Sequence, residues 1–135
     1  MSKTINIEVK LAPIGKPRMT RRDRWAKRPA VLRYYAWKDE LLKSAASEVE
    51  ELKTIIPDTV SIFGWFPHPK AWSMKKKLAM VGAPHNQKPD YDNIAKAVTD
   101  TLFEDDKTIS TGFQMFKWDD GGGARMRIII SGTLK

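Results

Sequence analysis

Residues 88 to 109 constrain the chain more than any other stretch, because an extended segment turns into an amphipathic helix there. Pro89 fixes its own backbone angle and favours an extended conformation at the residue before it. Asp90 and Asp92, two residues apart where the helix starts, are therefore expected to face the same side. Apolar side chains then recur at helical spacing, at Ile94, Ala97, Val98, Thr101 and Leu102. The spacing predicts a helix with one packed face and one face free for chemistry or solvent.

Polar and acidic side chains surround this predicted helix. Its second face carries three polar residues: Asn93, Lys96 and Asp100. Two carboxylates before the helix and one or two after it, from Asp105 and Asp106, could converge on a divalent cation such as Mg²⁺, which favours oxygen ligands. A purely structural interpretation also suffices, since Asp caps helices, Lys96 can pair with Asp92 at i, i+4, and Asp-Asp suits a turn. The spacing alone leaves both interpretations open.

The overall charge of the chain indicates a polyanionic partner. Its 135 residues contain 24 Lys and Arg against 16 Asp and Glu, a formal net charge of +8. Nucleic acid is the first expectation, and an anionic membrane surface is the lesser one. The length suits a single domain over residues 1–135.

Other classes of protein are disfavoured by what the sequence lacks. It has no cysteine for disulfides or thiolate sites, and its two histidines, far apart in the chain, do not suggest a zinc site. No apolar run approaches the roughly 20 residues of a membrane span, and no signal-peptide pattern opens the chain. We therefore expect a cytoplasmic protein with no membrane partner and no organic cofactor, in which any metal is held by oxygen ligands.

The first part of the chain predicts a strand followed by a basic loop. Residues 5 to 11 alternate between apolar and polar side chains, the period of a strand with one buried face. Residues 13 to 28 are too rich in proline and charge for a core element. We expect their basic side chains to contact DNA phosphates: Lys16, Arg18, Arg21, Arg22, Arg24, Lys27 and Arg28. Trp25 either stacks on unpaired bases or anchors the loop to the core.

A long amphipathic helix is predicted next, from Pro29 to about Lys53. Its apolar stripe consists of Val31, Leu32, Tyr35, Leu41, Leu42, Ala45, Val49 and Leu52. Tyr34 and Trp37 widen this stripe, so these two either pack in the core or contact a second subunit. Residues 59 to 66 then form a strand that is apolar on both faces, as in the centre of a sheet.

Residues 67 to 89 are irregular, rich in proline and basic. They contain five lysines and no acid: Lys70, Lys75, Lys76, Lys77 and Lys88. We expect a mobile loop that contacts DNA and orders on binding. Ser73 can cap one or two helical turns that end near Met80. His68 and His85 are expected to be solvated or to contact phosphate, and neither is given a role.

The last part of the chain predicts a β-hairpin. Two apolar segments, Thr108 to Trp118 and Ala124 to Ser131, flank the turn sequence Asp-Asp-Gly-Gly-Gly. The element order is then β-α-β-loop-α-β-β, which indicates an α+β domain whose mixed four-stranded sheet is covered by two main helices. Parallel pairing is expected somewhere in that sheet.

The segment from Pro89 to Leu102 resembles the D-x-D-N-x-x-K-x-x-x-D-x-L signature of the RusA family of Holliday junction resolvases, and every specified position matches. The likeness extends more weakly over most of the chain, through the element order, the basic stretch before the motif and the Asp-Asp after it. It implies a RusA-like fold and a homodimeric, Mg²⁺-dependent endodeoxyribonuclease, often encoded by prophages, that resolves four-way DNA junctions in recombination and repair.

Carried over residue by residue, the resemblance makes Asp90, Asp92 and one later acid metal ligands. Asp106 is favoured as that third ligand. Asp105 is the alternate and Glu104 is less favoured; the choice stays open because the interval from Asp100 to Asp106 is shorter than the family pattern leads us to expect. The ligands would hold one or two Mg²⁺ ions, or Mn²⁺ in their place, for hydrolysis of a phosphodiester.

The same resemblance gives a role to one polar residue of the helix. Lys96 would be the catalytic lysine, able to neutralise charge in the transition state. Apart from the resemblance, we expect Asn93 and Asp100 to orient the reacting groups through hydrogen bonds. Two other functions compete with this one: a non-catalytic basic DNA-binding protein, and a metal-dependent nuclease that acts on flaps or single strands.

Overall fold

A computed structural model describes residues 1–18 and 28–135 of the chain. Its elements are β1 (Ser2–Val9), α1 (Pro29–Ser44), α2 (Ala46–Leu52), β2 (Ile55–Phe66), α3 (Met74–Ala79), α4 (Tyr91–Leu102), β3 (Gln114–Trp118) and β4 (Arg125–Leu134). The predicted α+β class with a mixed four-stranded sheet is confirmed. Four predicted DNA contacts, Arg21, Arg22, Arg24 and Lys27, fall outside the described residues, as does Trp25 with its two alternative roles.

The four strands lie in the order β1-β4-β2-β3. β4 pairs antiparallel with both β1 and β2, and β2 pairs parallel with β3. The central position predicted for β2 and the presence of a parallel pair are therefore confirmed. Only one face of β2 is fully buried, however, because Phe63 and Trp65 on its other face are half-buried.

The predicted hairpin between the last two strands is wrong, because β2 lies between β3 and β4. The chain leaves β3 where β2 ends, and the Asp119 N–H donates to the Phe66 carbonyl at 2.8 Å. The Asp119 carboxylate accepts the N–H groups of Gly121 and Gly123, which have positive φ values of 105° and 89°. The glycine run thus carries the chain across the end of β2 instead of reversing it onto β3.

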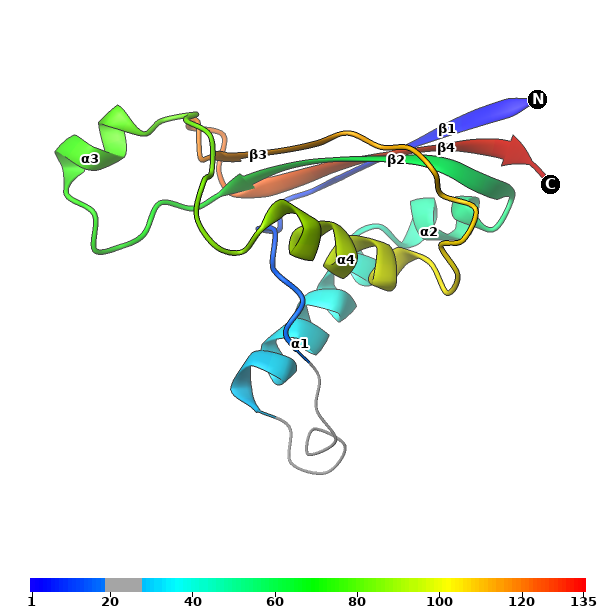
Figure 1. Cartoon of the computed structure of the whole chain (residues 1–135), viewed down its shortest axis with the longest axis horizontal. Coiled ribbons are helices and arrows are strands. Elements are labelled where there is room, and N and C mark those ends of the chain that lie inside the picture. Colours follow the sequence, from blue (N-terminus) through cyan, green and yellow to red (C-terminus); the bar gives the residue numbers. More distant parts are fainter. Residues whose placement is uncertain (19–27) are drawn as a thin grey trace.

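The hydrophobic core lies between one face of the sheet and the helices α1, α2 and α4, which share that side (Figure 1). Alternate strand residues supply it, among them Ile7, Ile62, Ile128 and Ile130, all almost fully buried. From α4 the apolar stripe predicted around Ile94 and Val98 is buried against them. Because this apolar face of α4 is buried, the opposite face of the helix lies outside the core.

The first predicted helix differs from expectation in two ways. It is broken at Ala45, where α1 ends and α2 begins. Tyr34 and Trp37 are 1% and 7% exposed, so these two side chains pack in the core and do not form a surface for a second subunit. Leu32 and Tyr35, which were expected in the buried stripe, are instead exposed. Trp37 donates its Nε1–H to the Ala12 carbonyl at 2.8 Å, which ties α1 to the segment after β1. Among the described residues, no helix is both long and apolar enough to cross a membrane.

Residues 67–82, here called the arm, carry α3 beyond the end of the sheet where β2 ends (Figure 1). The Ser73 hydroxyl accepts the Lys76 N–H at 3.2 Å, which confirms the predicted cap. After the arm, the chain returns along the outer edge of β3, where Trp118 N–H donates to the Ala83 carbonyl at 2.8 Å and His85 N–H to the Phe116 carbonyl at 2.9 Å. The arm is therefore held at both of its ends.

The two histidines of this region are half-buried, so neither is fully solvated, and a contact of either with phosphate stays a prediction. The His85 ring stacks on Phe66 at 3.9 Å between centroids, and burial lowers its pKa. The His68 ring lies 5.7 Å from Trp72 and 6.2 Å from Trp118. Both imidazoles act as flat packing groups where the arm joins the sheet, a role that sequence alone does not reveal because Trp118 comes from a distant strand.

Candidate active site at the start of helix α4

The start of α4 presents two carboxylates to one open groove. Asp90 is the residue before the helix, with extended backbone angles, and Asp92 lies in the first turn. Both line the groove. The Asp90 side chain makes no capping hydrogen bond, so its oxygens are not used by the helix as the structural interpretation requires. The two acids thus share one groove, although Asp92 already lies in the helix and not in the extended segment expected from the sequence.

The rest of the groove is polar and aromatic. Besides the acids it is lined by His85, Asn86, Gln87, Lys88, Pro89, Tyr91 and Phe116. The pKa of His85 is lowered by burial, so its ring is mainly neutral at physiological pH. Lys88 is a cation next to the acids in this groove.

Lys96 lies one helical turn beyond Asp92. Its Nζ is 3.4 Å from Asp92 Oδ2, and both side chains are mostly exposed. The predicted i, i+4 pair is thus present, but an exposed pair of this kind contributes little to stability. The ammonium group therefore remains available to a phosphate placed beside Asp92.

The segment after β1 is attached to the same end of α4. A Cβ atom on Gly15 would lie 2.5 Å from Pro89 Cβ and 3.0 Å from Asn93 Nδ2, so only glycine fits there. Lys16 donates its backbone N–H to the Asn93 carbonyl at 3.3 Å, and its ammonium group donates to the Asp100 carboxylate. The hydrogen bond to Asp100 raises the pKa of Lys16. Asn93 and Asp100 therefore hold a basic segment against the helix.

The acids after α4 lie at the other end of the helix. The twelve residues of α4 span about 18 Å. Beyond it, the Asp106 carbonyl accepts the Ile109 N–H, and Ser110 N–H donates to Asp58 near the start of β2. The groove, by contrast, includes Phe116, which pairs with Gly64 near the end of β2. Within one chain the structure does not bring Asp105 or Asp106 to the acids of the groove.

The two later acids also differ from each other. Asp105 accepts the Lys107 N–H at 3.0 Å and lies 3.4 Å from Lys107 Nζ. These interactions lower the pKa of Asp105.

Glu104 lies with Lys16 in a separate hollow beside α1. Across residues 1–18 and 28–135, no group of three or more acidic, histidine or cysteine side chains is close enough to share a metal ion.

The donor set of the groove nevertheless fits Mg²⁺. This ion keeps several of its waters and is usually bound by one or two carboxylates together with substrate phosphates. Asp90 and Asp92 supply two exposed carboxylates, and the amides of Asn86 and Gln87 lie in the same groove. A pair of carboxylates in an open polar groove matches that mode of binding.

Comparison with known families identifies the chain. The family model described as endodeoxyribonuclease RusA matches residues 10–131. The chain belongs to the RusA family. As a RusA endodeoxyribonuclease, it is an enzyme of the Holliday junction resolvase family, and the matched region contains the whole α4 motif. A search of curated proteins finds no significant match.

Basic residues of this RusA protein lie around the start of α4. Lys16, Arg18 and Lys96 line one hollow beside Asn93, and the Arg28 guanidinium donates to the Arg18 carbonyl. On the arm, the predicted DNA contacts Lys70, Lys75 and Lys76 are exposed and Lys77 is half-buried. Lys76 Nζ lies 4.6 Å from the centroid of the Trp72 ring, so this lysine is already engaged. The described basic residues thus approach the groove from two separate segments.

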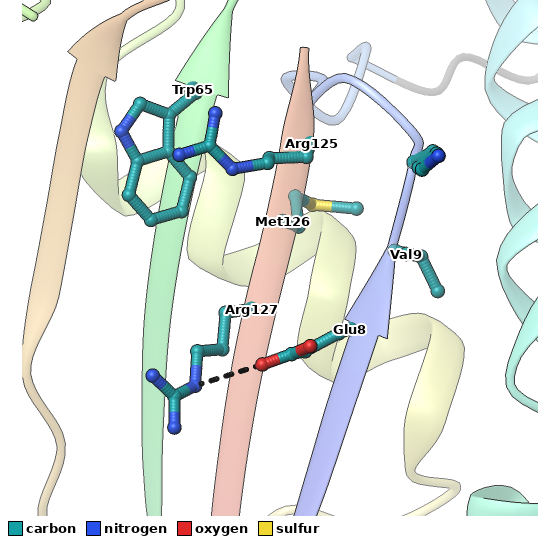
Figure 2. A pocket seen from close by; sticks show the side chains of 7 residues that line it. Glu8, Val9, Trp65, Arg125, Met126 and Arg127 are labelled. Carbon is teal, nitrogen blue, oxygen red and sulfur yellow. Dashed lines mark ion pairs between the residues drawn. The ribbon is translucent and has the colours of Figure 1, made fainter. Parts of the chain in front are cut away.

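A second hollow lies on the other face of the sheet and was not anticipated from sequence. It is lined by Glu8, Val9, Lys10, Trp65, Arg125, Met126 and Arg127 (Figure 2). The Arg125 guanidinium lies 4.0 Å from the centroid of the Trp65 ring and is paired with Asp120 at 3.0 Å. Arg127 is paired with Glu8 at 3.5 Å. Because these cations are paired and no predicted site residue is present, this hollow is separate from the candidate active site.

Proposed function

We propose that this RusA endodeoxyribonuclease is a Mg²⁺-dependent enzyme that resolves four-way DNA junctions in recombination and repair. The observation that supports this most directly is the pair Asp90 and Asp92, which line one groove and of which Asp90 makes no capping bond. The basic residues on both sides of the groove suit a phosphodiester backbone. The net charge of +8 is consistent with a nucleic acid substrate, and the cytoplasm is our proposed location for the enzyme.

Asp90 and Asp92 would hold one or two Mg²⁺ ions, with Mn²⁺ as a substitute. When bound, the ion supplies a nucleophilic water and stabilises charge on the leaving oxygen. Lys96 would neutralise the phosphate beside Asp92, since its ammonium group already lies 3.4 Å from that carboxylate. Asn93 and Asp100 would orient the site indirectly, through the Lys16 contacts that hold the basic segment on α4.

Asp106 remains our proposed third ligand, with Asp105 the alternate. In the arrangement of a single chain it is separated from Asp90 by the length of α4. It can therefore contribute only from a second copy of the chain or after a movement of residues 103–110. A homodimer, which we also propose, would meet this need and would match the two-fold symmetry of a four-way junction.

The deciding experiment separates binding from cutting. In Mg²⁺ the purified protein should nick a synthetic four-way junction, and in EDTA it should only bind it, because contacts from Lys and Arg need no metal ion. Absence of cleavage of the junction in Mg²⁺ would contradict the proposal. Faster cleavage of flap or single-stranded DNA than of the junction would support the proposed site but would mean that the four-way junction is not the preferred substrate.

A further inference from the structure

The arm carries an exposed apolar stripe. Met74, Leu78 and Val81 are 69%, 68% and 49% exposed. Met74 and Leu78 are one helical turn apart, so their side chains stand on one side of α3, and Val81 follows just after the helix ends. Contiguous exposed apolar side chains mark a contact surface, whereas a single one needs no explanation.

Lysines border this stripe on both sides. At about 100° per residue around a helix, Lys75 lies to one side of Met74 and Lys77 to the other. Lys76 points away from the stripe, over the ring of Trp72. The arm contains no acidic residue. This charge complements a polyanion and opposes contact with the arm of a second copy, so the partner that fits is nucleic acid.

The base of the arm is firmly supported. The Trp72 ring lies 4.7 Å from the Trp118 ring of β3, and Met80 and Ala83 pack against the core. Gly82 N–H donates to the Asp119 carbonyl at 3.3 Å. The side chains of the stripe are thus presented on a short helix that is fixed to the sheet at both ends. An element that pushes bases apart needs such support.

The arm also lies at the same end of the sheet as the acids. The chain passes from the arm into residues 85–92, which line most of the groove. Figure 1 shows α3 beyond the end of β2, the same end at which α4 starts. A DNA segment whose phosphate lies in the groove therefore has its neighbouring part near α3.

We propose that α3 is a wedge that inserts Met74 and Leu78 between base steps at the branch point of the DNA, while Lys75 and Lys77 bind the adjoining phosphates. The proposal rests on the proposed function. Insertion of apolar side chains requires unstacking of a base step, which costs less where a branch has already interrupted the stack. The wedge would therefore select branched over linear DNA, a selection that the carboxylates cannot make because phosphodiesters in both are alike.

The test uses Met74→Gln with Leu78→Gln, which keeps long side chains with good helix propensity and leaves all lysines in place. Junctions that carry 2-aminopurine at the branch point, and linear duplexes of the same sequence, are bound in EDTA. With the unmodified protein, fluorescence of the branch-point base should rise as it unstacks. In the double variant the rise should be lost, and the ratio of junction to duplex affinity should fall by about fivefold or more.

A matched control is Leu134→Gln, which changes an exposed leucine of β4 at the opposite end of the sheet and should alter neither quantity. Leu78→Gln alone should show part of the effect. The salt dependence of junction binding should stay the same in all variants, because the phosphate contacts remain.

Several results would overturn the wedge. The first applies if the unmodified protein binds and cuts the junction. In that case the wedge is wrong if the double variant keeps both the fluorescence rise and the ratio of junction to duplex affinity. Two others assign the stripe elsewhere: a lower mass of the double variant in sedimentation identifies a self-association surface, and loss of binding to anionic phospholipid vesicles identifies a membrane contact. If the unmodified protein neither binds nor cuts a junction, the proposed function fails first.

Discussion

Two pairs of acids flank helix α4, and their surroundings differ. Asp90 and Asp92 share an open groove, and the Asp90 side chain makes no capping bond. Asp105 is satisfied within its own turn by the N–H and ammonium groups of Lys107. The Asp106 side chain has no hydrogen bond to any residue that the structure describes.

This difference shows that the surroundings of an aspartate, and not the residue type alone, indicate its role. A carboxylate whose oxygens are occupied by local donors has a structural task, whereas one left open to a groove can bind a cation or a phosphate partner. By that criterion the turn explanation suffices for Asp105 and fails for Asp90. It also favours Asp106 over Asp105 as the third ligand.

The largest expected effect comes from the groove. Asp90→Asn nearly preserves shape and removes one ligand charge, so cleavage of a four-way junction in Mg²⁺ should fall by more than about a hundredfold. Junction affinity in EDTA should be equal or higher, because repulsion of the DNA phosphate is reduced. Asp92→Asn should behave alike, and Asp39→Asn on α1 serves as a matched control. Full cleavage by Asp90→Asn would contradict the mechanism. It would mean that Asp90 has only a structural role, because Asn replaces Asp well as a helix cap.

The second prediction concerns the later pair. Asp106→Asn should inactivate the enzyme, whereas Asp105→Asn should leave most of the activity, because the Asp105 oxygens are engaged by Lys107. Single-turnover cleavage of the junction measures both. Equal activities of the two variants would remove the preference for Asp106.

Mixing variants distinguishes a ligand within one chain from one supplied by a second copy. If Asp106 reaches the groove of a partner, a mixture of Asp90→Asn and Asp106→Asn proteins should regain cleavage, because one mixed site keeps both acids. If each site is built from one chain, every site of the mixture lacks one acid and no activity returns. Light scattering of the same mixture would verify that dimers form.

The third prediction concerns the lysines of the arm, whose replacement should weaken DNA binding, whereas replacement of the groove acids should weaken cleavage and leave binding intact. Replacing Lys75, Lys76 and Lys77 together with Ala should weaken junction binding and lower the slope of log affinity against log salt by about 2 to 3. The smaller value is expected if Lys76 stays over the Trp72 ring. Lys53→Ala, before the start of β2, is the control. An unchanged slope would remove the arm from the set of phosphate contacts.

Local signals in the sequence predicted local structure well. The cap by Ser73, the helical spacing of α4 and the central strand β2 each depend on residues close together in the chain. Asp90 and Asp92, only two positions apart in the sequence, also share one groove. The strongest part of the candidate site was therefore predictable.

Features that depend on distant segments were not predictable. The glycine run at residues 121–123 signals a tight change of direction, but it does not say that β2 will lie between the two strands it joins. The periodicity of α1 fits two overlapping stripes, and the contact of Trp37 with Ala12 selects the one that is buried. The separation of the two acid pairs likewise follows from the parallel pairing of β2 and β3, which places the start of β3 far from the groove.

The smallest expected effect isolates the structural task of Asp105. Its pKa is lowered from 3.8 by the Lys107 N–H and ammonium groups, so these interactions stabilise the fold above that pH and are lost as the pH falls below it. Asp105→Asn should therefore lower the melting temperature slightly at neutral pH, with a difference that shrinks below pH 3.8. Thermal unfolding of both proteins across this range measures it. A difference that persists unchanged in acid would mean that the turn depends on side-chain shape and not on charge, and would weaken the contrast drawn between Asp105 and the acids of the groove.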